Sequence, residues 1–142
     1  MESLFKHILV PLDFTRKNRA ALHYAQSIAE QNQADVTLLH VVERIEYAED
    51  KELNAFYEKL KILAQENLKN CAAGFKKANV PVATSVVMGK TAREIINYAM
   101  NQPIDLIVLS SHKVDLTEAP KGWATLSYQV SILCQCPVML VK

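Results

Sequence analysis

The sequence predicts an α/β protein in which one parallel β-sheet is covered by helices on both of its faces. Short apolar runs alternate along the chain with longer segments whose apolar residues recur at helical spacing. This alternation favours strands joined by right-handed helical crossovers, which lay the strands parallel in a three-layer, doubly wound fold. The length of 142 residues and the hydrophobic content of 50% fit one self-sufficient core, so we expect a single domain over residues 1–142.

Two strands and one helix are expected in the first third of the chain. Residues 7–12 form a short apolar run followed by turn residues, which indicates a buried strand. Thr15 is the expected N-cap of the helix that follows. The apolar stripe of this helix consists of Ala21, Tyr24, Ala25, Ile28 and Ala29. Residues 35–42 are almost continuously apolar, which is typical of a strand covered on both faces, and the polar residues 43–49 indicate a loop.

A long helix, a third strand and a further helix are expected in the middle of the chain. The long helix covers about residues 50–78. Its apolar stripe consists of Leu53, Phe56, Tyr57, Leu60, Leu63, Ala64, Leu68, Cys71, Ala72 and Phe75. Residues 82–87 indicate the third strand. Thr91 and Glu94 match a Thr-x-x-Glu capping box, which predicts that a helix starts there. The stripe of that helix consists of Ala92, Ile95, Ile96 and Ala99.

The last part of the chain predicts two more strands with a helix between them. Residues 106–110 indicate a strand, and residues 111–123 indicate a loop. The helix expected over residues 124–134 presents Leu126, Val130 and Leu133 to the core. Residues 138–141 indicate the final strand, so that five strands alternate with four helices.

Charge and composition exclude several classes of function. Lysine and arginine number 16 against 15 aspartate and glutamate residues, and the net charge of +1 gives no electrostatic attraction to nucleic acid or to a membrane surface. No apolar run approaches the roughly 18 residues of a membrane span, and the N-terminus lacks a signal peptide's long apolar region. We therefore expect a cytoplasmic protein. Three cysteines are too few for a disulfide framework, and Cys134 and Cys136 are expected to be buried structural thiols.

Residues that directly follow strands are the candidates for ligand binding. In doubly wound sheets, ligands bind outside the carboxyl ends of the strands, where the strand order reverses. The Asp13 carboxylate suits ribose hydroxyls or an adenine amino group, or else it stabilises a helix start. Gly89 either lets a ligand approach the backbone or serves a turn that needs a positive φ. The following Lys90-Thr91 does not complete a P-loop, because Thr84 stands where the earlier glycine is required.

The segment after the fourth strand and the start of the last helix carry groups that suit an anion. Residues 110–113 are Ser-Ser-His-Lys, with two hydroxyls, an imidazole and an ammonium group, although a loop histidine is also commonly just solvated. Ala124 and Thr125 open the last helix, whose first N–H groups either meet a phosphate or belong to an ordinary helix start.

Taken together, these motifs resemble the universal stress protein family over essentially the whole chain. The resemblance rests on residues 7–15, 38–43, 87–96, 105–112 and 136–141, which follow one another at the family's intervals. It implies an adenine nucleotide alpha-hydrolase-like fold whose five parallel strands lie in the order 3-2-1-4-5. It also implies a cytoplasmic stress-response protein, rather than a metabolic enzyme, that forms a homodimer through its last strand, Val138–Val141.

The nucleotide-binding branch of the family implies a set of site residues. On the base and sugar side these are Pro11, Asp13, Thr15, Val41, Met88 and Gly89. On the phosphate side they are Ser111, His112, Lys113, Ala124 and Thr125. That branch wraps the phosphates with glycines, whose positions fall here on Ser110, Lys113 and Ala124, and the loop between the last two is one residue longer. The resemblance therefore implies either weak or altered binding of an adenine nucleotide, or none.

Two hypotheses of function stay open. The first is a stress-response regulator that binds ATP or another adenine nucleotide, with Mg²⁺ present only when the nucleotide is bound. The second is a dimeric stress protein that binds no nucleotide and acts through protein–protein interaction, with Trp123 filling the phosphate side or presenting a contact. No catalytic constellation is evident, so we expect no enzymatic activity, and the sequence does not identify a protein partner.

Overall fold

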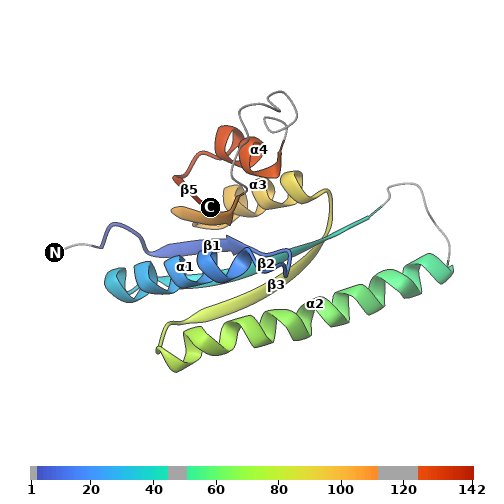
Figure 1. Ribbon diagram of the computed structural model, residues 1–142. Helices are drawn as coiled ribbons and strands as arrows, with labels where there is room; N and C mark the ends of the chain where they lie inside the picture. Colours follow the sequence, from blue (N-terminus) through green and yellow to red (C-terminus); the bar gives the residue numbers. More distant parts are fainter. Residues whose placement is uncertain (1–2, 45–50, 112–124) are drawn as a thin grey trace.

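The computed structural model describes residues 3–44, 51–111 and 125–142, which form a five-stranded parallel sheet and four helices (Figure 1). The elements in chain order are β1 His7–Pro11, α1 Asn18–Asn32, β2 Asp35–Glu43, α2 Lys51–Lys77, β3 Val82–Gly89, α3 Thr91–Asn101, β4 Leu106–Ser110, α4 Leu126–Leu133 and β5 Val138–Val141. The strands lie in the order β3-β2-β1-β4-β5, and every neighbouring pair is parallel. The predicted fold class and strand order are confirmed.

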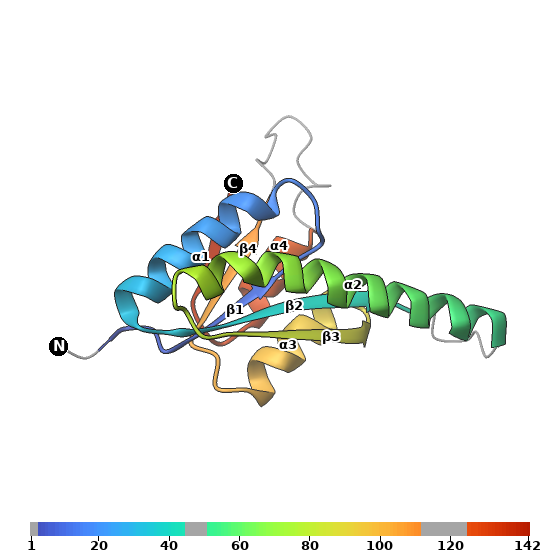
Figure 2. The same ribbon diagram turned by 90° about the horizontal axis from the view of Figure 1, so that it is seen from below.

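The helices cover both faces of the sheet and give the molecule three layers. α1 and α2 lie on one face, and α3 and α4 lie on the other (Figures 1 and 2). Successive side chains of a strand point to opposite faces, so β1 contributes to two cores. Ile8 and Val10 pack with α1 and α2, whereas Leu9 packs with α3 and α4.

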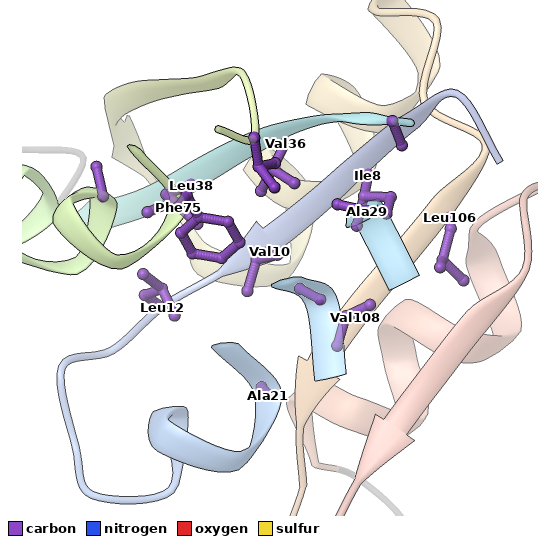
Figure 3. Close-up of a cluster of buried hydrophobic side chains, with 14 of the residues drawn as sticks. Ile8, Val10, Leu12, Ala21, Ala29, Val36, Leu38, Phe75, Leu106 and Val108 are labelled. Atoms are coloured by element: carbon purple, nitrogen blue, oxygen red, sulfur yellow. The ribbon is translucent and has the colours of Figure 1, made fainter. Parts of the chain in front are cut away.

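The core on the α1/α2 side is the larger of the two (Figure 3). α1 contributes the small residues Ala21, Ala25 and Ala29, which allow the helix to lie close to the strands. α2 contributes Leu68 and Phe75, and these larger side chains fill the space beside β2. Phe75 is only 1% exposed, so its truncation to alanine would cost about 3–5 kcal/mol.

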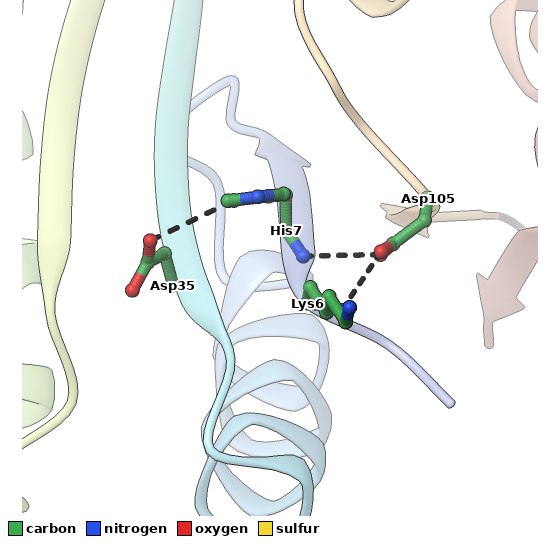
Figure 4. Close-up of polar contacts among 4 residues, drawn as sticks. All are labelled: Lys6, His7, Asp35 and Asp105. Carbon is green, nitrogen blue, oxygen red and sulfur yellow. Dashed lines mark hydrogen bonds and ion pairs between the residues drawn. The ribbon is translucent and has the colours of Figure 1, made fainter. Parts of the chain in front are cut away.

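Polar contacts join three strands at the amino edge of the sheet (Figure 4). The Asp105 carboxylate accepts hydrogen bonds from the backbone N–H groups of Lys6 at 2.8 Å and His7 at 3.1 Å, which ties the start of β4 to the start of β1. The His7 side chain lies with Nδ1 3.6 Å from an oxygen of Asp35 on β2. Charged and polar side chains therefore align β1, β2 and β4 at this edge.

Thr15 is not the N-cap of α1, contrary to the sequence prediction. The helix begins at Asn18, and Lys17 occupies the N-cap position without a side-chain hydrogen bond to the helix. The Thr15 hydroxyl instead donates to Asp13 Oδ1 at 2.7 Å, inside the turn that precedes the helix. The turn therefore uses the Thr15 hydroxyl, which an N-cap would need for the helix.

The prediction of a capping box at Thr91 and Glu94 is also wrong, although the helix starts at the predicted place. α3 begins at Thr91 and its N-cap is Lys90, with no side-chain cap hydrogen bond. The Thr91 hydroxyl donates across to Glu43 Oε1 on β2 at 2.7 Å. The Glu94 side chain lies against Gly89 rather than capping the helix.

Some apolar helix residues predicted to face the core are exposed. Tyr24, Phe56, Leu63 and Leu133 are 50%, 53%, 55% and 59% exposed, respectively. The beginning of α2 extends past the end of the sheet (Figure 2), so this part of the helix has fewer strand residues to pack against. α4 has only eight residues, of which Ser127 and Val130 are buried.

The described element boundaries differ from the predicted ones by one to three residues. β1 ends at Pro11, β2 continues through Glu43, β3 continues through Gly89, and α4 begins at Leu126. The three cysteines are half-buried rather than buried, and their thiols are free. Within the described parts of the chain, no helix is long and apolar enough to cross a membrane.

Candidate functional site

A cleft opens at the carboxyl edge of the sheet, next to the place where the strand order reverses between β1 and β4. Its volume is about 100 Å³. The residues that line this carboxyl-edge cleft are Pro11, Leu12, Asp13, Asn18, Leu39, His40, Val41, Thr91, Ile95, Leu109, Ser110 and Leu126. They come from three strands and three helices with their adjoining turns, and ligands of doubly wound sheets bind at this position.

Asp13 presents an ionised carboxylate at the mouth of the cleft. Its Oδ1 accepts hydrogen bonds from the backbone N–H of Thr15 at 3.0 Å and from the Thr15 hydroxyl at 2.7 Å. Partial burial raises the pKa of Asp13, but hydrogen bonds from Thr15 and Asn18 outweigh it and hold the pKa below its ordinary value of 3.8. The side chain is exposed, so a charged acceptor faces any ligand at this edge.

Asn18 holds the turn that carries Asp13. Its Oδ1 accepts hydrogen bonds from the backbone N–H groups of Asp13 at 3.1 Å and Phe14 at 2.7 Å. Its Nδ2 donates to the hydroxyl of Ser110, at the end of β4, at 3.0 Å. Asn18 is only 5% exposed. One buried amide therefore joins the first turn to β4 across the reversal point and fixes where the Asp13 carboxylate lies.

His40 forms part of the cleft wall on β2. Its Nδ1 lies 2.7 Å from the carbonyl oxygen of Leu12, and because a carbonyl can only accept, Nδ1 must carry the proton. A neutral ring would then offer Nε2 as an acceptor. The ring packs against Phe14, with centroids 4.4 Å apart, and Phe14 has a φ of 65° that is uncommon outside glycine. His40 thus supports the strained turn as well as lining the cleft.

Gly89 ends β3 with a φ of 151°, which side chains rarely adopt. A Cβ at this position would lie 2.6 Å from Oε1 of Glu94. The carbonyl of Gly89 accepts a hydrogen bond from the N–H of Arg44 at 3.3 Å. The group that makes the close approach to this glycine is therefore the protein's own Glu94 side chain.

The structure brings only part of the predicted base and sugar side together. Pro11, Asp13 and Val41 line the cleft, and Thr15 is hydrogen-bonded to Asp13 next to it. Met88 and Gly89, at the end of β3, lie outside the lining.

Of the residues predicted for the phosphate side, the structure describes Ser111 and Thr125. Ser111 is buried, and its N–H donates to the carbonyl of Val141 on β5 at 2.8 Å. Thr125 is the N-cap of α4, and its hydroxyl accepts a hydrogen bond from the N–H of Tyr128 at 3.4 Å. His112, Lys113 and Ala124 lie outside the described residues.

Sequence reasoning missed the roles of Asn18 and His40, because neither residue belongs to a recognisable binding motif. Ser110 is expected from the sequence to suit an anion, whereas the structure pairs its hydroxyl with Asn18. A weak signal existed for Asn18, because a polar residue near a helix start commonly binds neighbouring backbone N–H groups. No pattern in the sequence could show that its partner is Ser110, which lies 92 residues further along the chain.

By volume alone, another hollow exceeds the carboxyl-edge cleft. A hollow of about 310 Å³ lies at the amino edge, lined in part by His7, Asp35 and Tyr98. It lies at the opposite end of the strands from the reversal point, and His7 pairs with Asp35 there. Among the residues that the structure describes, no three His, Cys, Asp or Glu side chains gather to hold a metal ion.

Comparison with known proteins gives consistent matches over the full chain. The sequence model of the universal stress protein family matches residues 4–142. Universal stress protein YxiE of Bacillus subtilis is 27% identical over 98% of this chain and 100% of its own. Universal stress protein MJ0577 of Methanocaldococcus jannaschii is 28% identical over 100% of this chain and 98% of its own. A solved structure of MJ0577 is 26% identical, covers 98% of this chain and 96% of its own, and has a TM-score of 0.83. Universal stress protein UspA from Lactobacillus plantarum covers 99% and 100% with a TM-score of 0.81 at 24% identity.

Two more distant structures share the fold. A universal stress protein from Archaeoglobus fulgidus, described in complex with dAMP, covers 98% of this chain and 99% of its own with a TM-score of 0.71 at 15% identity. A universal stress protein described in complex with cAMP covers 99% of each chain with a TM-score of 0.74 at 15% identity.

Proposed function

The chain belongs to the universal stress protein family, and from that premise we propose that it is a regulator that binds an adenine nucleotide in the carboxyl-edge cleft. The observation that carries the proposal is the Asp13 carboxylate, which is ionised, exposed and held at the strand-order reversal by Asn18. Relatives with this fold are described in complex with dAMP and cAMP, and both ligands are adenine nucleotides.

The base and sugar side of the cleft has the chemistry that such a ligand needs. Asp13 accepts hydrogen bonds from ribose hydroxyls or from the adenine amino group. The buried residues Pro11 and Val41 line the cleft and provide apolar walls for the base. Thr15 holds the carboxylate in place through the two hydrogen bonds to Oδ1. Met88 and Gly89 join the site at its outer side, where Glu94 must yield to a ligand that approaches Gly89.

The phosphate side is proposed to differ from a glycine-lined loop. Ser111, His112, Lys113, Ala124 and Thr125 are its proposed residues, and the side chains of His112 and Lys113 would replace backbone N–H groups as donors. The cleft of about 100 Å³ is smaller than the ~300–1,000 Å³ of typical ligand sites. The described walls therefore enclose a base or a sugar but not a whole nucleotide, which supports weak or altered binding.

The proposed activity is binding and regulation rather than catalysis. Mg²⁺ is proposed to enter with the nucleotide phosphates, and among the described residues no three His, Cys, Asp or Glu side chains gather to hold it. We place this regulator in the cytoplasm as a stress-response protein with a single domain over residues 1–142.

A homodimer through β5 completes the proposal. β5 is an edge strand, so one side of it can pair with a second copy. The carbonyls of Pro137 and Val141 accept hydrogen bonds from β4, and by alternation the N–H groups of Val138 and Leu140 point to the open edge. Leu140→Pro removes one edge donor and should convert dimers to monomers in sedimentation experiments. Thr84→Pro, at the matching outward position of the β3 edge, is the control that should leave the dimer intact.

The nucleotide proposal is tested on protein purified without added nucleotide. Heat-denatured protein should release ATP, ADP or AMP on anion-exchange chromatography, or a calorimetric titration of the native protein with ATP should give saturable binding. Asp13→Ala should abolish the binding. Asp35→Ala removes another exposed carboxylate, at the opposite edge, and should bind as the wild type does.

The alternative is a dimeric stress protein that binds no nucleotide. The small volume of the cleft favours it. An empty supernatant and a flat titration with correctly folded protein would establish this alternative, and the dimer surface would then become the functional site.

A further inference from the structure

A sulfur-rich cavity lies on the α3/α4 side of the sheet, near the amino edge and away from the carboxyl-edge cleft. Its volume is about 260 Å³, and its lining consists of Ala99, Met100, Ile104, Cys134, Gln135 and Cys136. Met100 belongs to the last turn of α3, Cys134 is the C-cap of α4, and Cys136 precedes β5. Three sulfur-containing residues from two distant parts of the chain therefore line one cavity, and none of its lining residues is charged.

Cys134 and Cys136 stand two positions apart in the chain, and both line the cavity. Both are free and half-buried. Two thiolates in one cavity repel each other, and a cation bound between them removes that repulsion.

The ends of two helices add negative potential at the same place. α3 ends at Asn101 and α4 ends at Leu133, beside the cavity lining. The C-terminal end of a helix carries partial negative charge and favours a cation. Neither helix has a basic residue in its last turn, so no lysine or arginine of these turns supplies that cation.

Thiolate sulfur is a soft ligand that suits Cu(I), Zn²⁺ and iron–sulfur clusters. A thioether as the third ligand favours Cu(I), because Zn²⁺ sites are built from four thiolate, imidazole or carboxylate ligands. We propose that the cavity binds one Cu(I) ion through Sγ of Cys134 and Sγ of Cys136, with Sδ of Met100 as the third ligand. Each thiol releases its proton when the metal binds, so two thiolates and one Cu(I) leave one net negative charge. The metal enters as a monovalent ion, and no electron is transferred. A hard cation such as Mg²⁺ would find no carboxylate in this lining.

Competition for Cu(I) tests the proposal on the full-length protein under anaerobic conditions. Titration against a chromophoric Cu(I) chelator should show one ion bound per chain, with a thiolate-to-copper absorption band in the near ultraviolet. Cys134→Ser and Cys136→Ser should each weaken binding about tenfold or more, and Met100→Leu should weaken it less. Cys71→Ser is the matched control, because Cys71 packs against the α1/α2 core, and this variant should bind as the wild type does.

Equal losses in Cys71→Ser and Cys134→Ser, or a wild type that binds no better than Cys136→Ser, would overturn the proposal. A second measurement uses the wild type alone, so it does not depend on whether a variant folds. With methionine methyl groups labelled for NMR, one equivalent of Ag(I), a redox-inert substitute for Cu(I), should shift the Met100 signal and leave Met88 unmoved. A Met100 signal that stays in place would refute the proposed ligand set.

Discussion

The two edges of the sheet are fastened by different chemistry. At the amino edge, the Asp105 carboxylate itself joins β4 to β1 by accepting hydrogen bonds from backbone N–H groups. At the carboxyl edge, the neutral amide of Asn18 makes the connection to Ser110. Asp13 forms hydrogen bonds with Thr15 and Asn18, which belong to its own turn. Charge therefore serves the fold at one edge, whereas at the other an amide serves the fold and leaves the carboxylate exposed to a ligand.

Cavity volume alone would favour the amino edge as the binding site. The amino-edge hollow measures about 310 Å³ and the carboxyl-edge cleft about 100 Å³. A larger hollow offers room, but binding specificity comes from a few well-placed polar groups. At the amino edge Asp105 is already hydrogen-bonded to the backbone and Asp35 is paired with His7. The arrangement of polar groups, rather than the volume, is the reason for proposing a nucleotide site at the carboxyl edge.

Among substitutions at the two edges, the largest effect is expected from removing the Asn18 amide that fastens the carboxyl edge. Asn18→Ala leaves the N–H groups of Asp13 and Phe14 without their acceptor. The free energy of unfolding should fall by about 2–3 kcal/mol, measured by urea denaturation. Nucleotide affinity should fall as well, because the turn no longer holds Asp13.

Asn32 provides the matched control at the other end of α1. Its side chain accepts from the N–H of Phe5 at 3.3 Å and donates to the carbonyl of Ile28 at 2.9 Å. Asn32→Ala should cost about 1 kcal/mol and leave nucleotide affinity unchanged. Equal effects of the two substitutions on affinity would remove the distinction between the edges.

A somewhat smaller loss of stability is expected at the amino edge. Asp105→Asn keeps the shape of the side chain but removes the charge that strengthens the hydrogen bonds to Lys6 and His7. The free energy of unfolding should fall by about 1–2 kcal/mol, again measured with urea, while calorimetry shows unchanged nucleotide affinity. Weakened nucleotide binding in a folded Asp105→Asn protein would show that the amino edge takes part in the site.

The overall fold could be predicted from the sequence because it depends on patterns that cover many residues. Buried strands contain continuous apolar runs such as residues 106–109, and the elements alternate regularly. The strand order came from the resemblance to the family, and the structure confirms it. Membership of the family, also expected from the sequence, is confirmed by the match over residues 4–142.

The details of the site could not be predicted, because each depends on which of several available partners a side chain binds. Thr15 fits a cap motif, but Asp13 and Asn18 form a turn that uses its hydroxyl elsewhere. Thr91 fits a capping box, yet Glu43 on a neighbouring strand is its partner. Local motifs identify groups that can cap a helix, whereas the tertiary structure decides which partner each group has.

Gly89→Ala should lower stability moderately. A second substitution at Glu94 then separates the cost of backbone strain from the cost of the contact with Glu94. The new Cβ would meet Glu94, whose flexible side chain can move aside, but the φ of 151° remains unfavourable. The free energy of unfolding should fall by about 1–2 kcal/mol. Adding Glu94→Ala should recover only the part that comes from the contact. Full recovery in the double variant would mean that the backbone conformation costs little.

The smallest effect is the pH dependence contributed by Asp13. Because its pKa is lower in the folded protein than its ordinary value of 3.8, the ionised group stabilises the fold above that pH. This contribution is lost as the pH falls through the folded-state pKa. Asp13→Asn should therefore be less stable than the wild type near neutrality, and the difference should fade as the pH falls below 3.8. A difference that grows on acidification would reverse the assigned direction.

Hydrogen exchange with and without ATP tests the central claim, that the nucleotide binds at the carboxyl edge rather than in the larger hollow. ATP should slow amide exchange in residues 11–18 and at the end of β4, where Asp13, Asn18 and Ser110 lie. Residues 35–37 and 102–104, which belong to the amino-edge hollow, should exchange as before. Protection of the amino-edge segments, with no change in residues 11–18, would contradict the account.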